Sequence, residues 1–516
     1  MLTSCLCVCG YVQRLFVIML LIIVSREPMA YRFLSPCQHT SRTIIGGIRM
    51  IPLKLMTLAT SISLAIVAIE TSSATSKVLS LHTGQVASSF YNPIMNENAD
   101  PWMIKWDAKY YLTATTGDNI TLWSSNSITN IATGLQKTVW SPSGARSNFQ
   151  DIWSPEIYHL YHRWYVYFSA DKNGSNKTHR DYVLQSVSDS PWGPYKFAGN
   201  INSLNSQWMI DPTILTLRGH LYLLWSGWED AKNQIQCLYI APMSSPTQVS
   251  GSGVMISSPT YSWETSIAPI NEGPVVLQHN GHVFVIYSAN ASWTNSYCLG
   301  MLKLTGNDPL QPKAWVKSPR PVFTSANGVY GPGRASFVTS EDGKQYWMIY
   351  NAARYYDSGW DRTIRAQPFT WNRNGTPNFG TPMSLNTAIP LPSGEKPNRL
   401  NYSPLQEQGH SVFYVNVPRA GTYGLYLRYK NATGATTTQS VDVNGHPQLP
   451  ITFPPAGNTS GGTPDSVLDS FITLPKGRSK IQISTNSYTS AILQLQLTLT
   501  PVPLSADEES SSQLSK

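Results

Sequence analysis

A stretch of aromatic and aliphatic residues recurs five times between about residues 90 and 385, at steps of 54 to 63 residues. The copies are KYYLTATT (109–116), WYVYFSA (164–170), LYLLWSG (221–227), VFVIYSA (283–289) and YWMIYNA (346–352). A turn precedes each copy, and a short apolar segment precedes each turn, so each copy is predicted to be the second strand of a β-hairpin. Repeated hairpins at this period are typical of a β-propeller, in which each small sheet buries its faces on its neighbours. We therefore predict an all-β chain with a five-bladed β-propeller; a β-sandwich, which needs no such regular repetition, ranks second.

The residue that begins each first strand is acidic in four copies and basic in the fifth. These residues are Asp100, Glu156, Asp211, Glu272 and Arg334. Because the innermost strands of a propeller surround its axis, their equivalent ends are predicted to converge on one pocket. A lone Asp-Pro pair is more typical of a turn, but the recurrence in a chain with only 13% charged residues favours a site. Crowded carboxyls have their pKa values pushed apart, and the resulting acid and base are what glycoside hydrolysis requires.

Composition excludes several other classes. The apolar fraction of 41% is too high for a disordered chain, and Glu and Lys are too rare for a coiled coil. Of the net charge of +8, five Arg and one Glu in residues 1–49 contribute +4, and no Lys/Arg stripe occurs elsewhere. Nucleic acid is therefore not an expected partner.

Residues 1–76 are predicted to be a leader or signal region. Lys54, the apolar run LMTLATSISLAIVAI (55–69) and the small residues TSSATS that follow have the three parts of a secretory signal. Met50 stands just before them, so we expect translation to start there; one long leader or a signal anchor is the alternative. No apolar run here reaches the roughly 20 residues of a membrane span, so we expect a secreted, extracellular protein whose mature form has no stable span.

Glycosylation and cysteine placement agree with secretion. Eight N-x-S/T sequons occur, and only Cys237 and Cys298 lie beyond the leader. These two cysteines either form one disulfide or remain as two buried thiols. The mature protein is expected to be a monomer.

Segments in every repeat resemble glycoside hydrolase family 43. They are NPIMNENADPW (92–102), DIWSPEIYHLYHRWYVYFSA (151–170), WMIDPTILTLRGHLYLLWSGWED (208–230), NEGPVVLQHNGHVFVIYSAN (271–290), GPGRASF (331–337) and RAQPFTWNRNGTPNFGTP (365–382). The resemblance spans about 90–385 and implies a five-bladed propeller. It is greatest to the exo-acting α-L-arabinofuranosidases that trim arabinan, although endo-arabinanases and β-xylosidases share the scaffold.

The resemblance also implies residue roles. Asp100 in ADPW matches the general base that activates water, and Glu272 in NEGP matches the general acid that protonates the leaving oxygen. Asp211 in IDPT matches a third carboxylate that orients the acid and tunes its pKa. The family inverts configuration, so the acid and the base should be roughly 6.5–9.5 Å apart, which leaves room for water.

Substrate contacts are a further expectation. Arg365 resembles an arginine that contacts the sugar in the family, with Arg362 a weaker candidate for that role. The remaining candidates adjoin the motifs: Trp153, Glu156, Trp225 and Tyr287. An aromatic residue at such a position more often packs between blades than binds a ligand, and Trp153 is the best candidate among them.

Two departures from the family pattern bear on a metal ion. Many relatives have His where this chain has Arg334, near an axial ion that is often calcium, and YHA where this chain has Tyr350-Asn351-Ala352. Arg334 supplies a cation to an axial pocket lined by carboxyls, so we expect no metal and no other cofactor. Axial calcium is the disfavoured alternative. The same change also suggests a catalytically impaired carbohydrate-binding propeller.

The C-terminal part is predicted to be a separate module. The predicted boundaries are 77–388 for the propeller, 389–398 for a linker, 399–504 for a jelly-roll-like β-sandwich and 505–516 for a disordered tail. PRAGTYGLYLRY (418–429), VDVNG (441–445) and LPKGRSKIQI (474–483) resemble carbohydrate-binding modules of families 35 and 6. This module either binds polysaccharide or only supports the propeller.

Together these observations predict a secreted inverting glycosidase that releases L-arabinofuranose from plant cell-wall arabinan or arabinoxylan. The alternatives are a β-xylosidase or an endo-arabinanase on the same scaffold, or the impaired carbohydrate-binding propeller.

Overall fold

The computed structural model describes residues 84–201, 207–456, 466–484 and 490–502. In these ranges nearly all regular structure is β-strand, so the predicted all-β class is confirmed. One short α-helix and three 3-10 turns accompany the strands in the described ranges: α3 (Ser262–Thr265), η1 (Ile131–Thr133), η2 (Gly144–Arg146) and η3 (Pro312–Ala314). The predicted leader (1–76) and tail (505–516) lie outside the described residues.

Five consecutive antiparallel sheets contain the repeats, and in each the strands follow one another in chain order, except that the last strand of sheet 3 pairs with the third. Sheet 1 consists of β3 (Ala99–Trp106), β4 (Lys109–Thr115), β5 (Ile120–Ser125) and β6 (Leu135–Trp140). Sheet 2 consists of β7 (Phe149–Leu160), β8 (Arg163–Lys172), β9 (Ser175–Ser186) and β10 (Tyr195–Asn200). Sheet 3 consists of β11 (Met209–Leu217), β12 (His220–Trp228), β13 (Gln236–Ser245), β14 (Gln248–Val249) and β15 (Val254–Ser257). Sheet 4 consists of β16 (Asn271–His279), β17 (His282–Ala289), β18 (Cys298–Leu304) and β19 (Trp315–Lys317). Sheet 5 consists of β20 (Tyr330–Thr339), β21 (Tyr346–Ala353), β22 (Arg362–Trp371) and β23 (Pro377–Asn378).

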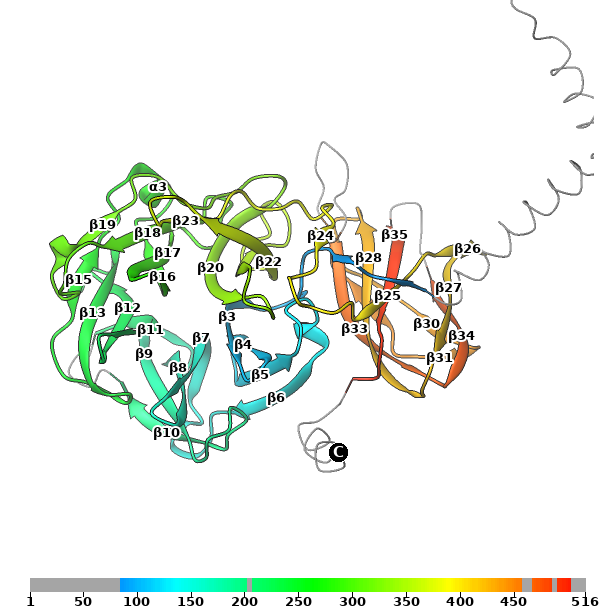
Figure 1. Cartoon of the computed structure of the whole chain (residues 1–516), viewed down its shortest axis with the longest axis horizontal. Coiled ribbons are helices and arrows are strands. Elements are labelled where there is room, and N and C mark those ends of the chain that lie inside the picture. Colours follow the sequence, from blue (N-terminus) through cyan, green and yellow to red (C-terminus); the bar gives the residue numbers. More distant parts are fainter. Residues whose placement is uncertain (1–83, 202–206, 457–465, 485–489, 503–516) are drawn as a thin grey trace, which may run out of the picture. The chain divides into compact units, whose positions relative to one another are not determined.

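The five sheets form a closed ring. The first strand of each sheet contacts the first strand of the next, and β20 of sheet 5 contacts β3 of sheet 1 (Figure 1). A separate apolar core fills each of the five gaps between neighbouring sheets. Representative residues of these cores are Trp164, Tyr167, Tyr287, Tyr350 and Trp347. The large aromatic content of the repeats therefore serves mainly to join sheet to sheet.

The C-terminal strands form two five-stranded sheets and one two-stranded sheet. The first is ordered β1 (Gln85–Val86), β25 (Arg399–Tyr402), β35 (Ser490–Thr498), β28 (Gly421–Asn431) and β33 (Ser466–Leu474). The second is ordered β26 (Leu405–Glu407), β27 (His410–Val417), β34 (Gly477–Ser484), β30 (Val441–Val443) and β31 (His446–Pro447). The pair is β29 (Thr437–Gln439) with β32 (Ile451–Phe453). One apolar core includes side chains from both large sheets, such as Leu425 and Ile481.

Two short strands pair across the predicted boundaries. β1 lies within the predicted 77–388 domain, yet it pairs with β25 of the C-terminal sheet. In the predicted linker, β24 (Ile389–Pro390) pairs with β2 (Ser89–Phe90).

Two further findings concern the expectations on secretion. Across the ranges that the structure describes, no helix is long and apolar enough to cross a membrane. Of the two alternatives for Cys237 and Cys298, the structure has two buried free thiols.

Candidate active site

Each first strand of the ring contains a bulge near its beginning. There two residues interrupt the pairing with the second strand in sheets 1, 3 and 4, and related register shifts occur in sheets 2 and 5. In each sheet a residue of the bulge has positive φ, and we call these five the bulge residues: Asp100, Ser154, Asp211, Gly273 and Arg334. The second register shifts of sheets 2 and 5 add Asp151 and Gly331, which also have positive φ. Such a conformation costs a non-glycine residue roughly 1–3 kcal/mol, so it persists only where the surroundings hold it in place.

The bulge corrects the predicted set of equivalent positions. Glu156 lies two residues after the bulge residue of its sheet, and Glu272 lies one residue before its own. A count of residues along the sequence treats each strand as regular, whereas a bulge shifts the side-chain alternation. The five predicted residues still come from the first strands, but they do not occupy one repeated position.

Side chains of neighbouring sheets hold the bulges. In four of the five sheets, the N–H of the bulge residue donates to a small polar side chain on the second strand of the preceding sheet. The pairs are Asp100 with Asn351, Ser154 with Thr115, Asp211 with Ser169, and Arg334 with Ser288, at 2.8–2.9 Å. In the remaining sheet the N–H of Gly273 donates to Asp211 Oδ2 at 3.0 Å. The small polar residue that recurs in every repeat thus fixes the backbone of the site.

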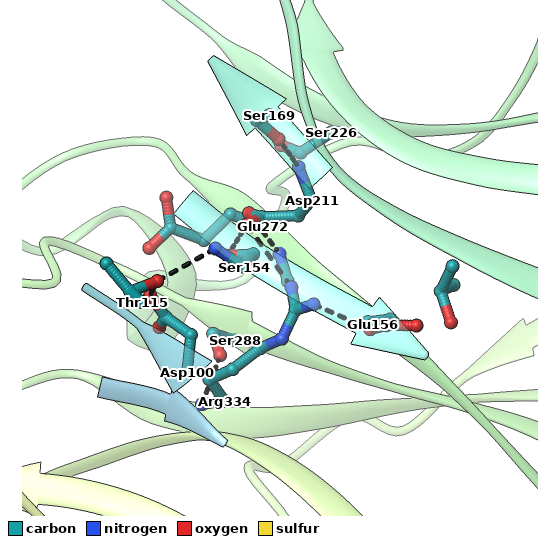
Figure 2. A network of polar contacts seen from close by, with 12 residues as sticks. Asp100, Thr115, Ser154, Glu156, Ser169, Asp211, Ser226, Glu272, Ser288 and Arg334 are labelled. Carbon is teal, nitrogen blue, oxygen red and sulfur yellow. Dashed lines mark hydrogen bonds and ion pairs between the residues drawn. The ribbon is translucent and has the colours of Figure 1, made fainter. Parts of the chain in front are cut away.

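Arg334 lies among the carboxyls and is only 2% exposed. Its Nη2 donates to Glu156 Oε1 at 2.6 Å, and its Nη1 lies 3.2 Å from Asp211 Oδ1 (Figure 2). A Cβ atom on Gly273 would lie 3.0 Å from Arg334 Cδ, so glycine at that bulge leaves room for the guanidinium. Burial raises the pKa of Glu156 to about 7, and the charge of Arg334 opposes that rise.

Asp211 is held from two sides. Ser154 Oγ donates to its Oδ1 at 2.5 Å, and the N–H of Gly273 donates to its Oδ2. Burial raises the pKa of Asp211, while Arg334 and these hydrogen bonds act in the opposite direction. Its negative charge in turn acts on Glu272.

Glu272 has the properties of a proton donor. Tyr297 donates to its Oε1 at 2.8 Å, and Gln236 Nε2 donates to its Oε2 at 3.2 Å. The side chain of Glu272 is partly accessible, but the protein packed around its carboxyl group leaves little room for water. This burial, followed by repulsion from Asp211, raises the pKa of Glu272 to about 7. The carboxyl is therefore largely protonated in mildly acidic solution.

Asp100 has different surroundings. Thr115 Oγ1 donates to its Oδ2 at 2.7 Å, and Arg362 Nη1 lies 3.8 Å from its Oδ1. Its side chain is 18% exposed, so solvent reaches it. One accessible carboxyl beside a cation and one densely packed carboxyl with a raised pKa are surroundings that suit a base and an acid.

The structure changes the assignment of the arginines. Arg365 is fully buried and donates to Ala353 O and Thr363 Oγ1, so it does not reach the carboxyl group of Asp100, as Arg362 does. The two arginines are three residues apart on β22, and side chains an odd number apart point to opposite faces of a strand.

The aromatic candidates for sugar contacts differ in how exposed they are. Trp225 is buried against Tyr239, and Tyr287 is buried with its hydroxyl on Glu264, so neither is free to stack on a sugar. Trp153 is partly exposed and stacks on His179 with ring centroids 4.0 Å apart. It remains a candidate.

Three contacts of the site were missed in the sequence. Tyr297 and Gln236, which hold Glu272, come from segments without a repeated motif, whereas Ser154, which holds Asp211, lies in the repeated first strand of sheet 2. Only Ser154 carried a signal, because it precedes Pro155 as Asp100 precedes Pro101.

The donor set does not fit an axial metal ion. The two carboxyls that could face one, Glu156 and Asp211, already share the guanidinium of Arg334. In the part of the chain that the structure describes, no three His, Cys, Asp or Glu side chains are grouped as metal ligands.

Comparisons with known proteins agree with this geometry. The chain matches the model of the glycosyl hydrolases family 43 over residues 90–377. It is 39% identical, over 57% of this chain and 64% of the relative, to an extracellular exo-α-(1→5)-L-arabinofuranosidase of Streptomyces avermitilis. It is 32% identical, over 72% of this chain and 74% of the relative, to α-L-arabinofuranosidase 43 of Humicola insolens. The match thus spans less than two thirds of the length of the Streptomyces protein.

A solved structure is also similar to this chain. The crystal structure of an α-L-arabinofuranosidase from Lactobacillus brevis has a TM-score of 0.54 and 32% identity, and the match covers 58% of this chain and 98% of that one. With the family model matched over more than half of its length, the chain belongs to glycosyl hydrolases family 43.

Proposed function

We propose that the protein is a secreted inverting exo-α-L-arabinofuranosidase that releases L-arabinofuranose from plant cell-wall arabinan or arabinoxylan. The observation that carries this proposal is that Glu272, whose surroundings raise its pKa to about 7, and the accessible carboxyl of Asp100 lie in one site (Figure 2). The arabinofuranosidases among its relatives support the choice of sugar. The word "extracellular" in the name of one relative supports secretion.

The chemistry uses three carboxyls. Asp100 accepts a proton from a water molecule, whose oxygen attacks the anomeric carbon of the sugar. Glu272 gives its proton to the glycosidic oxygen as the bond between that oxygen and the anomeric carbon breaks. Asp211 keeps the pKa of Glu272 high through its negative charge, so the acid stays loaded with a proton. The water enters on the face opposite the leaving group, and the configuration inverts.

The architecture we propose has two parts. The ring of five sheets is a five-bladed β-propeller, supported by the five inter-sheet cores and by the contacts between first strands. The two C-terminal sheets are a β-sandwich of the carbohydrate-binding type, supported by their shared core. We propose that the mature protein works as a monomer on polysaccharide or oligosaccharide, without nucleic acid.

We also propose that catalysis needs no metal ion. Arg334 places a cation between Glu156 and Asp211, where its two contacts leave these carboxyls paired. Activity is therefore expected to survive EDTA, measured as the rate of arabinose release before and after dialysis. Loss of activity that calcium restores would overturn this part.

The test of the function is product analysis. Residues 77–516, secreted from a host cell, are incubated with debranched arabinan, and the products are followed by chromatography. Arabinose from the first time point is the expected result. Early oligosaccharides would indicate an endo-arabinanase, and activity only on aryl xylosides would indicate a β-xylosidase. Binding of arabinan without any product would indicate a carbohydrate-binding propeller that has lost its hydrolytic activity and that has Arg334 in its axial pocket.

A further inference from the structure

Two exposed tryptophans lie together on loops of sheets 4 and 5. Trp293, in the loop between β17 and β18, is 44% exposed, and Trp360, in the loop between β21 and β22, is 69% exposed. Their ring centroids are 5.8 Å apart at an interplanar angle of 68°. Large apolar side chains gathered at the surface mark a binding surface more often than isolated ones do. We call Trp293 and Trp360 the tryptophan platform.

Polar contacts connect this platform to the catalytic carboxyls. Trp360 Nε1 donates to Ser292 Oγ at 3.2 Å, and Arg362 Nη2 donates to Ser292 O at 2.6 Å. Arg362 is the arginine beside Asp100, and its guanidinium also lies 5.3 Å from the ring centroid of Tyr297, which holds Glu272. The loop that carries Trp293 therefore also carries Tyr297, which contacts the acid, and Ser292, which binds the arginine beside the base.

The platform is fixed in place. Asn295 of the first loop and Asp357 of the second exchange two hydrogen bonds, from Asn295 Nδ2 to Asp357 Oδ1 and from Asp357 N to Asn295 Oδ1. At the base of the second loop, Arg354 binds the carboxylate of Asp361 and donates to Asn96 with both Nη atoms. A preformed surface loses little conformational entropy when a ligand binds.

A cavity of about 380 Å³ adjoins the platform. Trp360 lines it together with the immediate surroundings of the base: Ala99, Thr115 and Arg362. Glu97 and Asp361 add carboxylate oxygens to its lining. Its volume falls in the roughly 300–1,000 Å³ range of small-ligand pockets, and the combination of one aromatic face with several hydrogen-bonding groups suits a sugar.

We propose that the tryptophan platform and this cavity form a subsite for a sugar unit of the substrate other than the one that is released. The sugar ring stacks on Trp360, and its hydroxyls bond to the polar lining. The occupant follows from continuity, because the cavity shares Thr115 and Arg362 with the base itself. This inference rests on the proposed function for the identity of the sugar.

The test compares two substrates that differ in length. An aryl α-L-arabinofuranoside carries one sugar, whereas an α-1,5-linked arabino-oligosaccharide reaches the subsite. For Trp360→Ala and Trp293→Ala, the ratio of kcat/KM on the oligosaccharide to kcat/KM on the aryl glycoside should fall about tenfold, the size of one good aromatic contact. The loss should appear mainly in KM, because a distant sugar is bound alike before and during bond cleavage.

Two variants serve as controls. Trp360→Phe keeps an aromatic face and should restore much of the ratio. Tyr161→Ala removes a 66% exposed aromatic from the turn between β7 and β8 and should leave the ratio at the wild-type value. An unchanged ratio in both tryptophan variants, or an equal loss on both substrates, would overturn the proposal.

A binding measurement keeps the inference separate from the proposed function. Calorimetric titration of the arabino-oligosaccharide into Glu272→Gln should give a Kd about tenfold lower than into Glu272→Gln with Trp360→Ala. If the wild-type protein hydrolyses neither substrate, the proposed function fails, and this pair of titrations still decides whether the platform binds the sugar chain. Equal Kd values, or no binding to either variant, would refute it.

Discussion

Two glutamates eight residues apart, Glu264 and Glu272, have pKa values shifted in opposite directions. Glu264 in α3 is fully buried and accepts hydrogen bonds from five groups. The donors are Thr260 N, Tyr261 N, Asn271 Nδ2, Tyr287 Oη and Lys317 Nζ. Burial favours the neutral form of Glu264, but these donors outweigh it and its pKa is lowered. Glu272 has two donors and a neighbouring anion, and its pKa rises to about 7.

The difference teaches what makes a buried carboxyl an acid. The protein packed around each glutamate favours the neutral form of both, so desolvation alone does not distinguish them. The two glutamates differ in the number of hydrogen-bond donors around each carboxyl group and in the sign of the neighbouring charge. Glu264 is held as an anion inside the fold, whereas the raised pKa of Glu272 suits the proposed proton donor.

The largest effects are expected when each glutamate is replaced by its amide. Glu272→Gln should lower kcat about 10³-fold on substrates with a poor leaving group, because the amide has no proton to give. Its thermal midpoint should stay near that of the wild type, since Glu272 is already neutral at mildly acidic pH. The checks are steady-state kinetics and thermal unfolding, and activity within tenfold of the wild type would contradict the role of Glu272.

Glu264→Gln should show the opposite pattern. Removal of one member of a buried ion pair leaves Lys317 without its partner and should destabilise the fold by about 3 kcal/mol. Because the pKa of Glu264 is lowered, its contribution to stability exists above pH 4.5 and is lost as the pH falls. Denaturant unfolding at pH 7 and at pH 3.5 measures this, and the difference between wild type and variant should shrink at the lower pH.

A subtler change removes one donor from Glu272. Tyr297→Phe deletes the hydrogen bond to Oε1, which favours the ionised form, so the pKa of Glu272 should rise further. The alkaline limb of the kcat profile should then move upward from about pH 7, by about one unit. A limb that stays in place or moves to lower pH would mean that another group controls it.

The smallest effect is expected at a third buried carboxyl. Asp181 accepts one hydrogen bond, from Ser169 Oγ at 2.8 Å, and burial raises its pKa well above the usual range. Burial thus favours its neutral form, and Asp181→Asn, which keeps a neutral side chain of the same shape, should change kcat less than about twofold. A large loss would show that its charge matters to Asp211, whose N–H is held by the same Ser169.

The periodic part of the structure could be predicted from the sequence. The aromatic hairpins follow from short-range alternation, and their repetition predicts sheets that pack on one another. The repeat singled out Asp100, Asp211 and Glu272, and the family resemblance supplied their expected roles. The structure brings the three to one region (Figure 2).

The remaining features of the site could not be predicted, because they depend on bulges, strand faces and loop contacts that the spacing of residues in the sequence does not show. The bulges shift Glu156 and Glu272 out of phase with the other first-strand residues. Strand alternation turns Arg362 toward Asp100 and Arg365 away from it. Tyr297 reaches Glu272 through a loop 25 residues further along the chain, and no local pattern predicts such a contact.

The bulges have a consequence for how such a site can change its chemistry. In four sheets the N–H that fixes the bulge is bound by a side chain of the preceding sheet, so the bulge backbone does not depend on the identity of its own side chain. These four bulge positions carry two carboxyls, a hydroxyl and a guanidinium, whereas the fifth carries glycine, because a Cβ atom there would crowd Arg334. A new substituent at Ser154, for example, would alter the charge beside Asp211 while the frame stays as it is. In these sheets the hydrogen-bonded backbone of the bulge stays constant, and the side chain of the bulge residue is free to vary.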